Sequence, residues 1–453
     1  MTGRSGSSIA VEQHGLSSIP SASQSWNFDK FVSEFQAIVM SFTPETIEFD
    51  LINIDCTFAN AIRRILLAEV PSFAIDRVYL YQNTSVIADE TFSHRLGLVP
   101  LNVDPGKMGF CTADLPDSDD LMQGLGDPPK KVVTGSLRKA SSLFLCIVQT
   151  SLGNEGASYP APVSKKILLN KLGPGDEIMA RCLAIKGVGR DHAKFSPVSV
   201  AFYKLLPSIE ISGTVRGELA KKLQRSFAKG VIDVDSRTQI ASVANARLDN
   251  GSREHLRHPD LAAVVHVSLN PRHFIFTVES IAPGYRPPDT LVKCAFDVML
   301  SKCAHYLTIV EKSGFAASPL GGPSADVGGE LTEEATKTCL NGRVVGLEVA
   351  FVSNDLRRAT FRFTGEDHTL GAPLRYCILR SEAVKLCGYC QPHPLEDSIT
   401  FEIQSRDEMA VTVLRNGLYC LRACFEHIKR KFKSAMKKAQ KQASKPTSSD
   451  QIA

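Results

Sequence analysis

TFANAIRRILL (Thr57 to Leu67) and TLGAPLRYCIL (Thr369 to Leu379) read as two copies of one short helix. The copies align without gaps, pairing Thr57 with Thr369, Phe58 with Leu370, Ile62 with Leu374, Arg63 with Arg375 and Leu67 with Leu379. An acid, Asp55 or Asp367, lies two residues before each copy, and an alternating strand-like run precedes each acid. Two related strand–helix units in one chain suggest a pseudo-symmetric pair that packs against itself. Chance similarity over eleven residues is the alternative.

Size and composition are those of an ordinary globular protein of about three domains. The 453 residues are 43% apolar and 22% charged, and the net charge of +4 favours no particular nucleic-acid or membrane partner. No apolar run approaches the ~18 residues of a membrane span, and we find no secretory signal. Twelve cysteines in scattered core-like segments favour reduced thiols, as in the cytosol or nucleus, over a disulfide scaffold.

The predicted fold class is α+β: two related strand–helix units form an intrachain pseudo-dimer, and a β-rich domain is inserted into the first. The expected boundaries are disorder at 1–25, a discontinuous first unit at 26–101 and 263–312, the insertion at 102–262, a linker at 313–345, a second unit at 346–440, and a disordered tail at 441–453. The linker's ~33 residues would span roughly 30 Å if flexible, which is enough to let the two units meet.

The expected elements can be placed from hydrophobic periodicity. The first unit is expected to have strands at 46–54, 75–81 and 273–280 and helices at 57–69 and 289–311. The second is expected to have strands near 347–353, 359–364, 384–390 and 398–404, a helix at 369–380, and a long final helix.

The final helix carries the clearest periodic signal. Its apolar residues are spaced 4, 3, 4, 3, 4, at Leu414, Leu418, Leu421, Phe425, Ile428 and Phe432. Such a stripe must be covered in water. Either it packs on the sheet of its own unit, or a helix of the other unit covers it.

Three longer strings point to a family. ILLAEVPSFAIDRVYLYQNTSVIADETFSHRLGLVPLNVDP (Ile65 to Pro105), AIKGVGRDHAKFSPVSVAFYKLLP (Ala184 to Pro207) and FTGEDHTLGAPLRYCILRSEAVKLCGYCQPHP (Phe363 to Pro394) resemble the two alpha-like subunits of eukaryotic RNA polymerases I and III, which are related to bacterial alpha. Residues 26–312 resemble the larger subunit and 347–440 the smaller. The two subunits, normally separate, are here one polypeptide, either a genuine fusion or a joined gene model.

The chain departs from related patterns at informative places. After Pro100 only Cys111 precedes Cys146, so the clustered cysteines of the polymerase II relative are absent. The CGY string at 387–389 also resembles the polymerase I and III subunit more. The family usually has Asn at the position of Ala372 followed by a non-proline residue, whereas Pro373 follows here, so we expect the helix to survive with a shifted start.

The resemblance implies that each unit is an alpha-like dimerisation unit with two helices packed on a sheet, and that the helices of both units form a four-helix interface. The residues expected there are Phe58, Ile62, Ile65 and Leu66 of the first copy, Leu370, Leu374 and Ile378 of the second, and Leu414, Leu418, Leu421, Phe425 and Ile428 of the final helix. It also implies docking to the polymerase through Arg63 and Arg64, for which a solvated helix face is an equal alternative. The same docking role is implied for His94 and Arg95.

Other motifs allow competing interpretations. Cys387, Cys390 and His393 have a metal-like spacing but no obvious fourth ligand, so a turn is preferred. Cys420 and Cys424 fit the core of a helix. Asp191 and His192 could suggest acid–base chemistry, but a loop that fixes the insertion is preferred. The basic stretch His427 to Lys445 fits the wet face of a packed helix, with nuclear import or weak nucleic-acid contact as alternatives.

These observations predict a non-catalytic scaffold of RNA polymerases I and III without cofactor or metal. The expected partners are the largest and second-largest subunits and small assembly subunits, with DNA only indirectly involved and no membrane. The expected location is the nucleus, including the nucleolus. The alternatives are the equivalent polymerase II subunit, a stand-alone nucleic-acid-binding protein, or an enzyme using the cysteine or Asp191/His192 groups.

Overall fold

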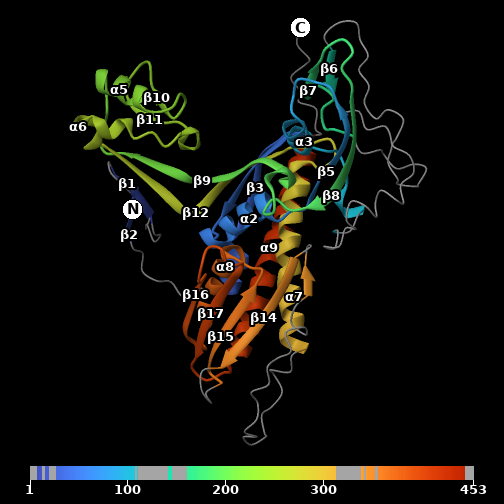
Figure 1. The fold of residues 1–453 in the computed structure, drawn as a ribbon. Helices are drawn as coiled ribbons and strands as arrows, with labels where there is room; N and C mark the ends of the chain where they lie inside the picture. Colours follow the sequence, from blue (N-terminus) through green and yellow to red (C-terminus); the bar gives the residue numbers. More distant parts are fainter. Residues whose placement is uncertain are drawn as a thin grey trace, which may run out of the picture.

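In the computed structural model, two sheets and the helices packed on them share one large hydrophobic core. Figure 1 shows how these elements are arranged. The structure describes residues 8–12, 16–19, 27–107, 110, 141–144, 161–312, 338–340, 343–351 and 356–443. Two smaller cores lie outside the large one. Within the described residues, no helix combines the length and apolar character needed to cross a bilayer.

The first unit has an antiparallel sheet with strand order β2 (Leu16–Ile19), β1 (Ser8–Val11), β12, β4 and β3, and β9 also pairs with β12. Its elements are α1 (Phe28–Glu34), β3 (Gln36–Phe42), β4 (Thr46–Ile52), α2 (Cys56–Ala68), β9 (Val198–Ile211), β12 (Val265–Ser280) and α7 (Pro288–Lys312). The alternation in β4 buries Ile47, Phe49 and Leu51 in the core. This face receives α2 and α7.

The second unit repeats this plan with the sheet order β13-β14-β15-β17-β16. Its elements are β13 (Thr338–Leu340), β14 (Arg343–Phe351), β15 (Arg358–Thr364), α8 (His368–Leu379), β16 (Val384–Cys390), β17 (Ser398–Ser405) and α9 (Ala410–Ala443). In β15 the buried positions again alternate, placing Ala359, Phe361 and Phe363 in the core.

The two repeated helices begin in the same way. The side chain of Asp55 accepts a hydrogen bond from the backbone nitrogen of Thr57 at the start of α2, and Asp367 does the same for Thr369 at the start of α8. The upstream acid of each copy is therefore a helix N-cap. The expected shift of the second start does not occur. Pro373 lies in the second turn, where it removes one backbone hydrogen bond without ending the helix.

The stripe on α9 is covered largely by the other unit. Helix α9 runs beside α7 of the first unit (Figure 1) and also contacts α8, β17 and the first unit's β3. All six residues of the stripe, Leu414, Leu418, Leu421, Phe425, Ile428 and Phe432, are fully buried. The prediction of a partner helix in the other unit is thus confirmed.

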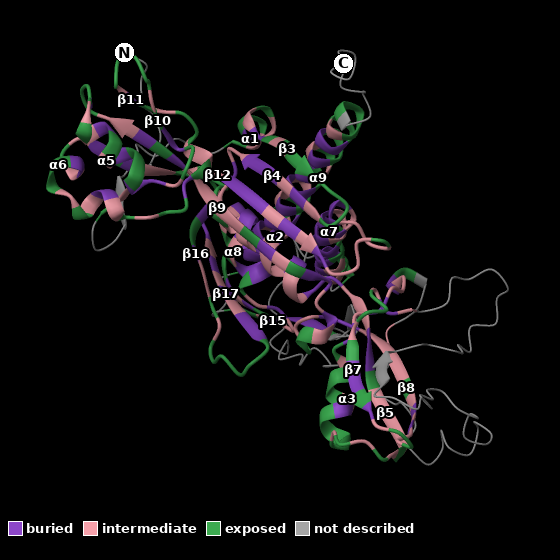
Figure 2. Cartoon of the chain, turned by 90° about the horizontal axis from the view of Figure 1, so that it is seen from above, coloured by how far each residue is buried: buried purple, intermediate pink, exposed green. Residues whose placement is uncertain are grey.

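The single β-rich insertion expected at 102–262 is replaced by two separate small units at opposite ends of the main body (Figure 2). One contains β5 (Ser72–Asn83), α3 (Asp89–Gly97), β6 (Ser141–Phe144), β7 (Leu168–Leu172) and β8 (Ile178–Gly187). The other contains α5 (Glu218–Ser226), β10 (Ile232–Val234), β11 (Ala241–Val243) and α6 (Pro259–Ala262).

Strand β9 explains the difference. It pairs with β12 from Val198 to Ile211, so its first half belongs to the main sheet and its second half carries the α5–α6 unit. Arg247 ties that unit back to β4, because its guanidinium lies 2.6 Å from Asp50 Oδ2 and 2.7 Å from Glu48 Oε1. Conversely β5, expected to belong to the first unit, pairs with β8 instead.

The expected boundaries also change at the ends of the units. Within 1–25, predicted to be disordered, β1 (Ser8–Val11) and β2 (Leu16–Ile19) form a hairpin that extends the main sheet through β12. Of the predicted linker, 313–337 and 341–342 lie outside the described residues, while 338–340 and 343–345 belong to β13 and β14. Of the predicted tail, 441–443 complete α9 and 444–453 lie outside the described residues.

Candidate functional site: the interface between the two repeated units

The apolar part of the interface gathers every residue that the sequence predicted for it. Each of the twelve is at most 2% exposed: Phe58, Ile62, Ile65, Leu66, Leu370, Leu374, Ile378, Leu414, Leu418, Leu421, Phe425 and Ile428. The ring of Phe58 in α2 lies 5.5 Å from Tyr376 of α8 and 5.7 Å from Phe425 of α9, centroid to centroid. Each fully buried side chain of this size contributes about 1.5–3 kcal/mol.

Aromatic residues outside the predicted set extend this interface. Phe432 of α9 packs edge-on against Phe49 of β4 and Phe296 of α7, at 5.1 and 5.7 Å. Tyr306 of α7 packs against Phe363 of β15 at 5.0 Å. Phe432 was visible in the periodic stripe, whereas nothing in the sequence singled out Tyr376 or Phe296.

A buried lysine joins the units through two carboxylates. The Lys302 ammonium of α7 lies 2.8 Å from Glu69 Oε2, just after α2, and 2.7 Å from Glu366 Oε2, just before α8. The Tyr306 hydroxyl donates to Glu366 Oε1 at 3.2 Å. The side chains of Lys302 and Glu366 are 7% and 1% exposed. The sequence held a signal for this, since Lys302 falls on the apolar face of its helix.

Burial and charge oppose each other in this cluster. Burial alone would lower the pKa of Lys302, but the carboxylates of Glu366 and Glu69 outweigh it and raise the pKa. Burial raises the pKa of Glu366, although Lys302 acts in the opposite direction. Removing one partner of such a group leaves an uncompensated buried charge, which is far costlier than losing a surface pair. The cluster therefore selects one docking of the two units.

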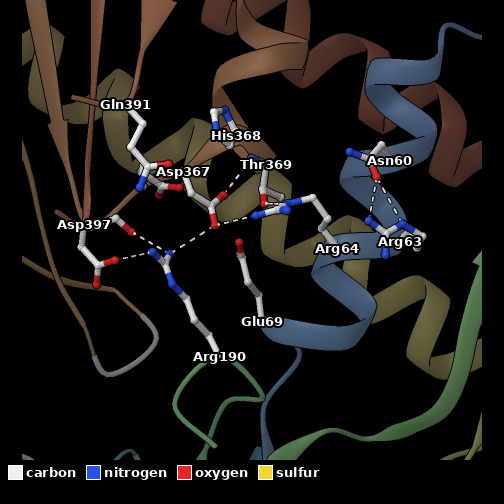
Figure 3. A network of polar contacts seen from close by, with 12 residues as sticks. Asn60, Arg63, Arg64, Glu69, Arg190, Asp367, His368, Thr369, Gln391 and Asp397 are labelled. Carbon is white, nitrogen blue, oxygen red and sulfur yellow. Dashed lines mark hydrogen bonds and ion pairs between the residues drawn. The ribbon is translucent and has the colours of Figure 1, made fainter. Parts of the chain in front are cut away.

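A second polar group lies at the start of α8 (Figure 3). Arg64 of α2 donates to Thr369 Oγ1 at 2.9 Å and to Asp367 Oδ2 at 3.0 Å. Arg190 lies 3.5 Å from the same Asp367 oxygen and 2.6 Å from Asp397 Oδ1. Burial tends to raise the pKa of Asp367, but the Thr369 hydrogen bonds and the two arginines lower it to about 2.

Arg190 is held in place by a close backbone approach. Its backbone nitrogen donates to the carbonyl of Ala68 at the end of α2, at 2.9 Å. A Cβ at the preceding Gly189 would lie 2.2 Å from the Leu67 carbonyl oxygen, so only glycine allows this contact. The loop thus brings a residue that sequence reasoning missed, Arg190, to the interface.

The four predicted docking residues are divided among different places. Arg64 lies within the intrachain interface, in contrast to the docking surface or solvated face that we expected. Arg63 donates to Asn60 on its own helix and is partly exposed (Figure 3). On α3, Arg95 donates to the carbonyls of Leu168 and Leu169, and His94 is exposed.

The motifs with competing interpretations take ordinary structural roles. His192 caps a short 3₁₀ turn by accepting from the backbone nitrogen of Lys194. Cys387 is buried and Cys390 exposed on β16, while His393 accepts from the Leu395 nitrogen in a turn. In the part of the chain that the structure describes, the one group of three metal-type ligands within reach of each other is instead Cys377, Cys420 and Cys424.

Comparison with known proteins identifies the two units independently. Two family profiles, both described as the RNA polymerase Rpb3/Rpb11 dimerisation domain, match residues 48–303 and 358–431. The human RPAC1 subunit of DNA-directed RNA polymerases I and III is 38% identical over 309 residues, covering 62% of this chain and 86% of the human protein. The Saccharomyces cerevisiae counterpart is 38% identical over 310 residues, covering 63% and 90%. The Dictyostelium discoideum RNA polymerase II subunit rpb3 is 31% identical over 290 residues, covering 58% and 91%.

Replacing Lys302 by Met is expected to lower the free energy of unfolding by about 3–5 kcal/mol, because Glu69 and Glu366 would remain buried without a cation. Urea denaturation at neutral pH measures the loss. Lys429→Met is the matched control, since Lys429 also bridges the units, to the exposed Asp297, and should cost less than about 1 kcal/mol. Equal losses in both variants would contradict a special role for the buried group.

Asp367→Asn is expected to remove a pH-dependent part of the stability while keeping a side chain that can cap α8. The pKa of Asp367 is lowered from its ordinary value of 3.8 to about 2. At pH values above 3.8 its charge therefore contributes about 2 kcal/mol to the free energy of unfolding, and this contribution is lost as the pH falls toward 2. Unfolding of both proteins should be measured from pH 6 to pH 2.5. A constant difference across this range would show that charge is not the cause.

Cleavage at a protease site engineered between 313 and 337 is expected to leave the two units associated, because the apolar interface does not depend on the connection. With Leu421→Asp and Phe425→Asp together, the cleaved halves should separate on size-exclusion chromatography, since both charges would enter the core. Lys433→Asp with Lys437→Asp, on the solvent side of α9, is the control. Halves that stay together in the double core variant would refute this account of the interface.

Proposed function

Since the chain belongs to the RNA polymerase Rpb3/Rpb11 dimerisation-domain family, we propose that it is a non-catalytic, alpha-like assembly subunit of DNA-directed RNA polymerases I and III. In this proposal residues 26–312 act as the larger alpha-like subunit and residues 346–440 as the smaller one. The two halves form the heterodimer within one polypeptide. Nucleotide addition then takes place in partner subunits.

The observation that carries the proposal is the mutual burial of the two matched regions. Both profile matches fall on the two repeated units, and the helices of each unit complete the core of the other. In the Lys302 cluster, Lys302, Glu69 and Tyr306 come from the first unit and Glu366 comes from the second. A pair that is closed in this way would suit a platform for assembly.

Two observations favour polymerases I and III over polymerase II. Identity is 38% to the human and yeast polymerase I and III subunits, 32% to the Dictyostelium polymerase I and III subunit, and 31% to the Dictyostelium polymerase II subunit. The segment after Pro100 also has only Cys111 before Cys146, which is too few thiols for a four-cysteine metal site. The polymerase II counterpart remains the second candidate.

The partner surfaces follow from what the intrachain interface leaves exposed. Arg63 is partly exposed beside Asn60 on α2, and it is the arginine we assign to docking of the second-largest subunit. His94 and Arg95 on the small α3 unit are assigned to a second contact with the polymerase body. The largest subunit and small assembly subunits would bind through the other half. The expected location is the nucleus, including the nucleolus, with DNA contacted only through the complex.

The pattern of charges in the basic stretch from His427 favours packing of α9 over nucleic-acid binding. Phe432 and Met436 are buried between its charges, and Lys429 pairs with Asp297 of α7. Alternating buried and charged positions are those of a helix with one wet face. The isolated chain should therefore bind nucleic acid weakly.

Purification of the tagged full chain from its native cells tests the proposal. We expect the largest and second-largest subunits of polymerases I and III to co-purify, and a peptide spanning 313–345 to appear at the same abundance as the flanking peptides. Recovery of polymerase II subunits alone would favour the second candidate. Recovery of no polymerase subunit would overturn the proposal.

Arg63→Glu is expected to reduce co-purification of the second-largest subunit several-fold, because a reversed charge at a docking contact repels its former partner. The intrachain core should be unaffected, since Arg63 bonds only to Asn60 among its described hydrogen bonds. Arg257→Glu, on the exposed surface of the α5–α6 unit, is the control. Unchanged recovery would mean that Arg63 is only a solvated residue.

A further inference from the structure

Three cysteines meet where α8 packs against α9. The sulfur atoms of Cys377 from α8 and of Cys420 and Cys424 from α9 all lie within 4.8 Å of one another. Cys377 and Cys424 are buried, whereas Cys420 is partly exposed. The group shares no residue with the Cys387, Cys390 and His393 pattern. The proposed polymerase role gives it no task.

The arrangement follows from helix geometry. Cys420 and Cys424 are four residues apart and therefore share one face of α9, with one helical turn between them. Gly417, almost one turn earlier, allows α8 to come close: a Cβ there would lie 2.4 Å from Cγ1 of Ile378. Ile378 is the neighbour of Cys377, so the same close approach brings the third sulfur to the pair.

The distances suit a metal ion bound by thiolates. Zinc bonds sulfur at about 2.3 Å, so two sulfurs of a tetrahedral site lie about 3.8 Å apart. Sulfurs already within 4.8 Å reach that spacing through small side-chain movements.

We propose that Cys377, Cys420 and Cys424 bind one Zn²⁺ ion through three thiolates, leaving the fourth position to water. The partly exposed Cys420 gives the ion a path from solvent. A bound ion would tie α8 to α9, which are the two helices that the second unit contributes to the interface. This inference does not depend on the polymerase assignment, because it concerns one unit's internal helix pair.

Metal titration of the full-length chain tests the proposal. The chain is purified with reductant, treated with a chelator and titrated with Co²⁺ as an optical probe and then with Zn²⁺. We expect about one equivalent of Co²⁺ to give sulfur-to-metal charge-transfer absorption, and Zn²⁺ to displace it. Cys420→Ser should weaken binding at least about tenfold, whereas Cys390→Ser, an exposed cysteine of the same unit, should not.

Alkylation of the unmutated chain gives a second test that does not depend on how variants fold. Zn²⁺ should slow alkylation of the partly exposed Cys420 but not of the exposed Cys182 and Cys390, as read by peptide mass spectrometry. Addition of chelator should reverse the protection. Metal uptake that is equal in Cys420→Ser and Cys390→Ser, or protection spread over all these cysteines alike, would overturn the proposal.

Discussion

The fold depends on two helix pairs whose apolar faces are buried against each other. Helices α2 and α7 leave one apolar face beyond the first sheet, and α8 and α9 leave another beyond the second. Apolar burial supplies most of the free energy but little direction, because it is roughly proportional to area. Direction comes from the Lys302 cluster, in which Lys302 and Glu69 belong to the first unit and Glu366 is supplied by the second.

The pseudo-symmetry of the repeat is broken at the two helix starts. Arg64 of α2 reaches the cap of α8 at Asp367, while the matching position on α8 is Tyr376, whose pKa is raised to about 12 by burial and by the nearby charge of Asp55. In a two-fold symmetric pair, the residue at this helix position in each unit lies against the helix N-cap of the other unit. Two copies of the second unit would thus set Tyr376 against Asp367 and lack the arginine. The asymmetry disfavours the pairing of two second units.

Local patterns predicted the helices, the main strands and the apolar interface well, because each depends on residues close in sequence. The α9 stripe and the alternation in β4 and β15 are of this kind. Long-range pairing was less accessible. Strand β9 passes from the main sheet into the α5–α6 unit, and its length determines how the insertion is divided. The residues of a strand do not by themselves identify the strand with which it pairs. Arg190 and the three clustered cysteines were missed for the same reason, since their neighbours are distant in sequence.

The order of the two units along the chain also determines how long the first unit is exposed during synthesis. Helix α7 ends at Lys312, but α9, which covers it, ends at Ala443, so 131 residues separate the two ends. At a ribosomal rate of about 5–20 residues per second, roughly 7–26 seconds pass between the synthesis of α7 and the completion of α9, which covers the apolar face of the first unit. During that interval a nascent chain offers a hydrophobic surface to chaperones. Joining the halves in one chain fixes their ratio at one to one. It also means that every copy of the chain passes through this interval during its synthesis.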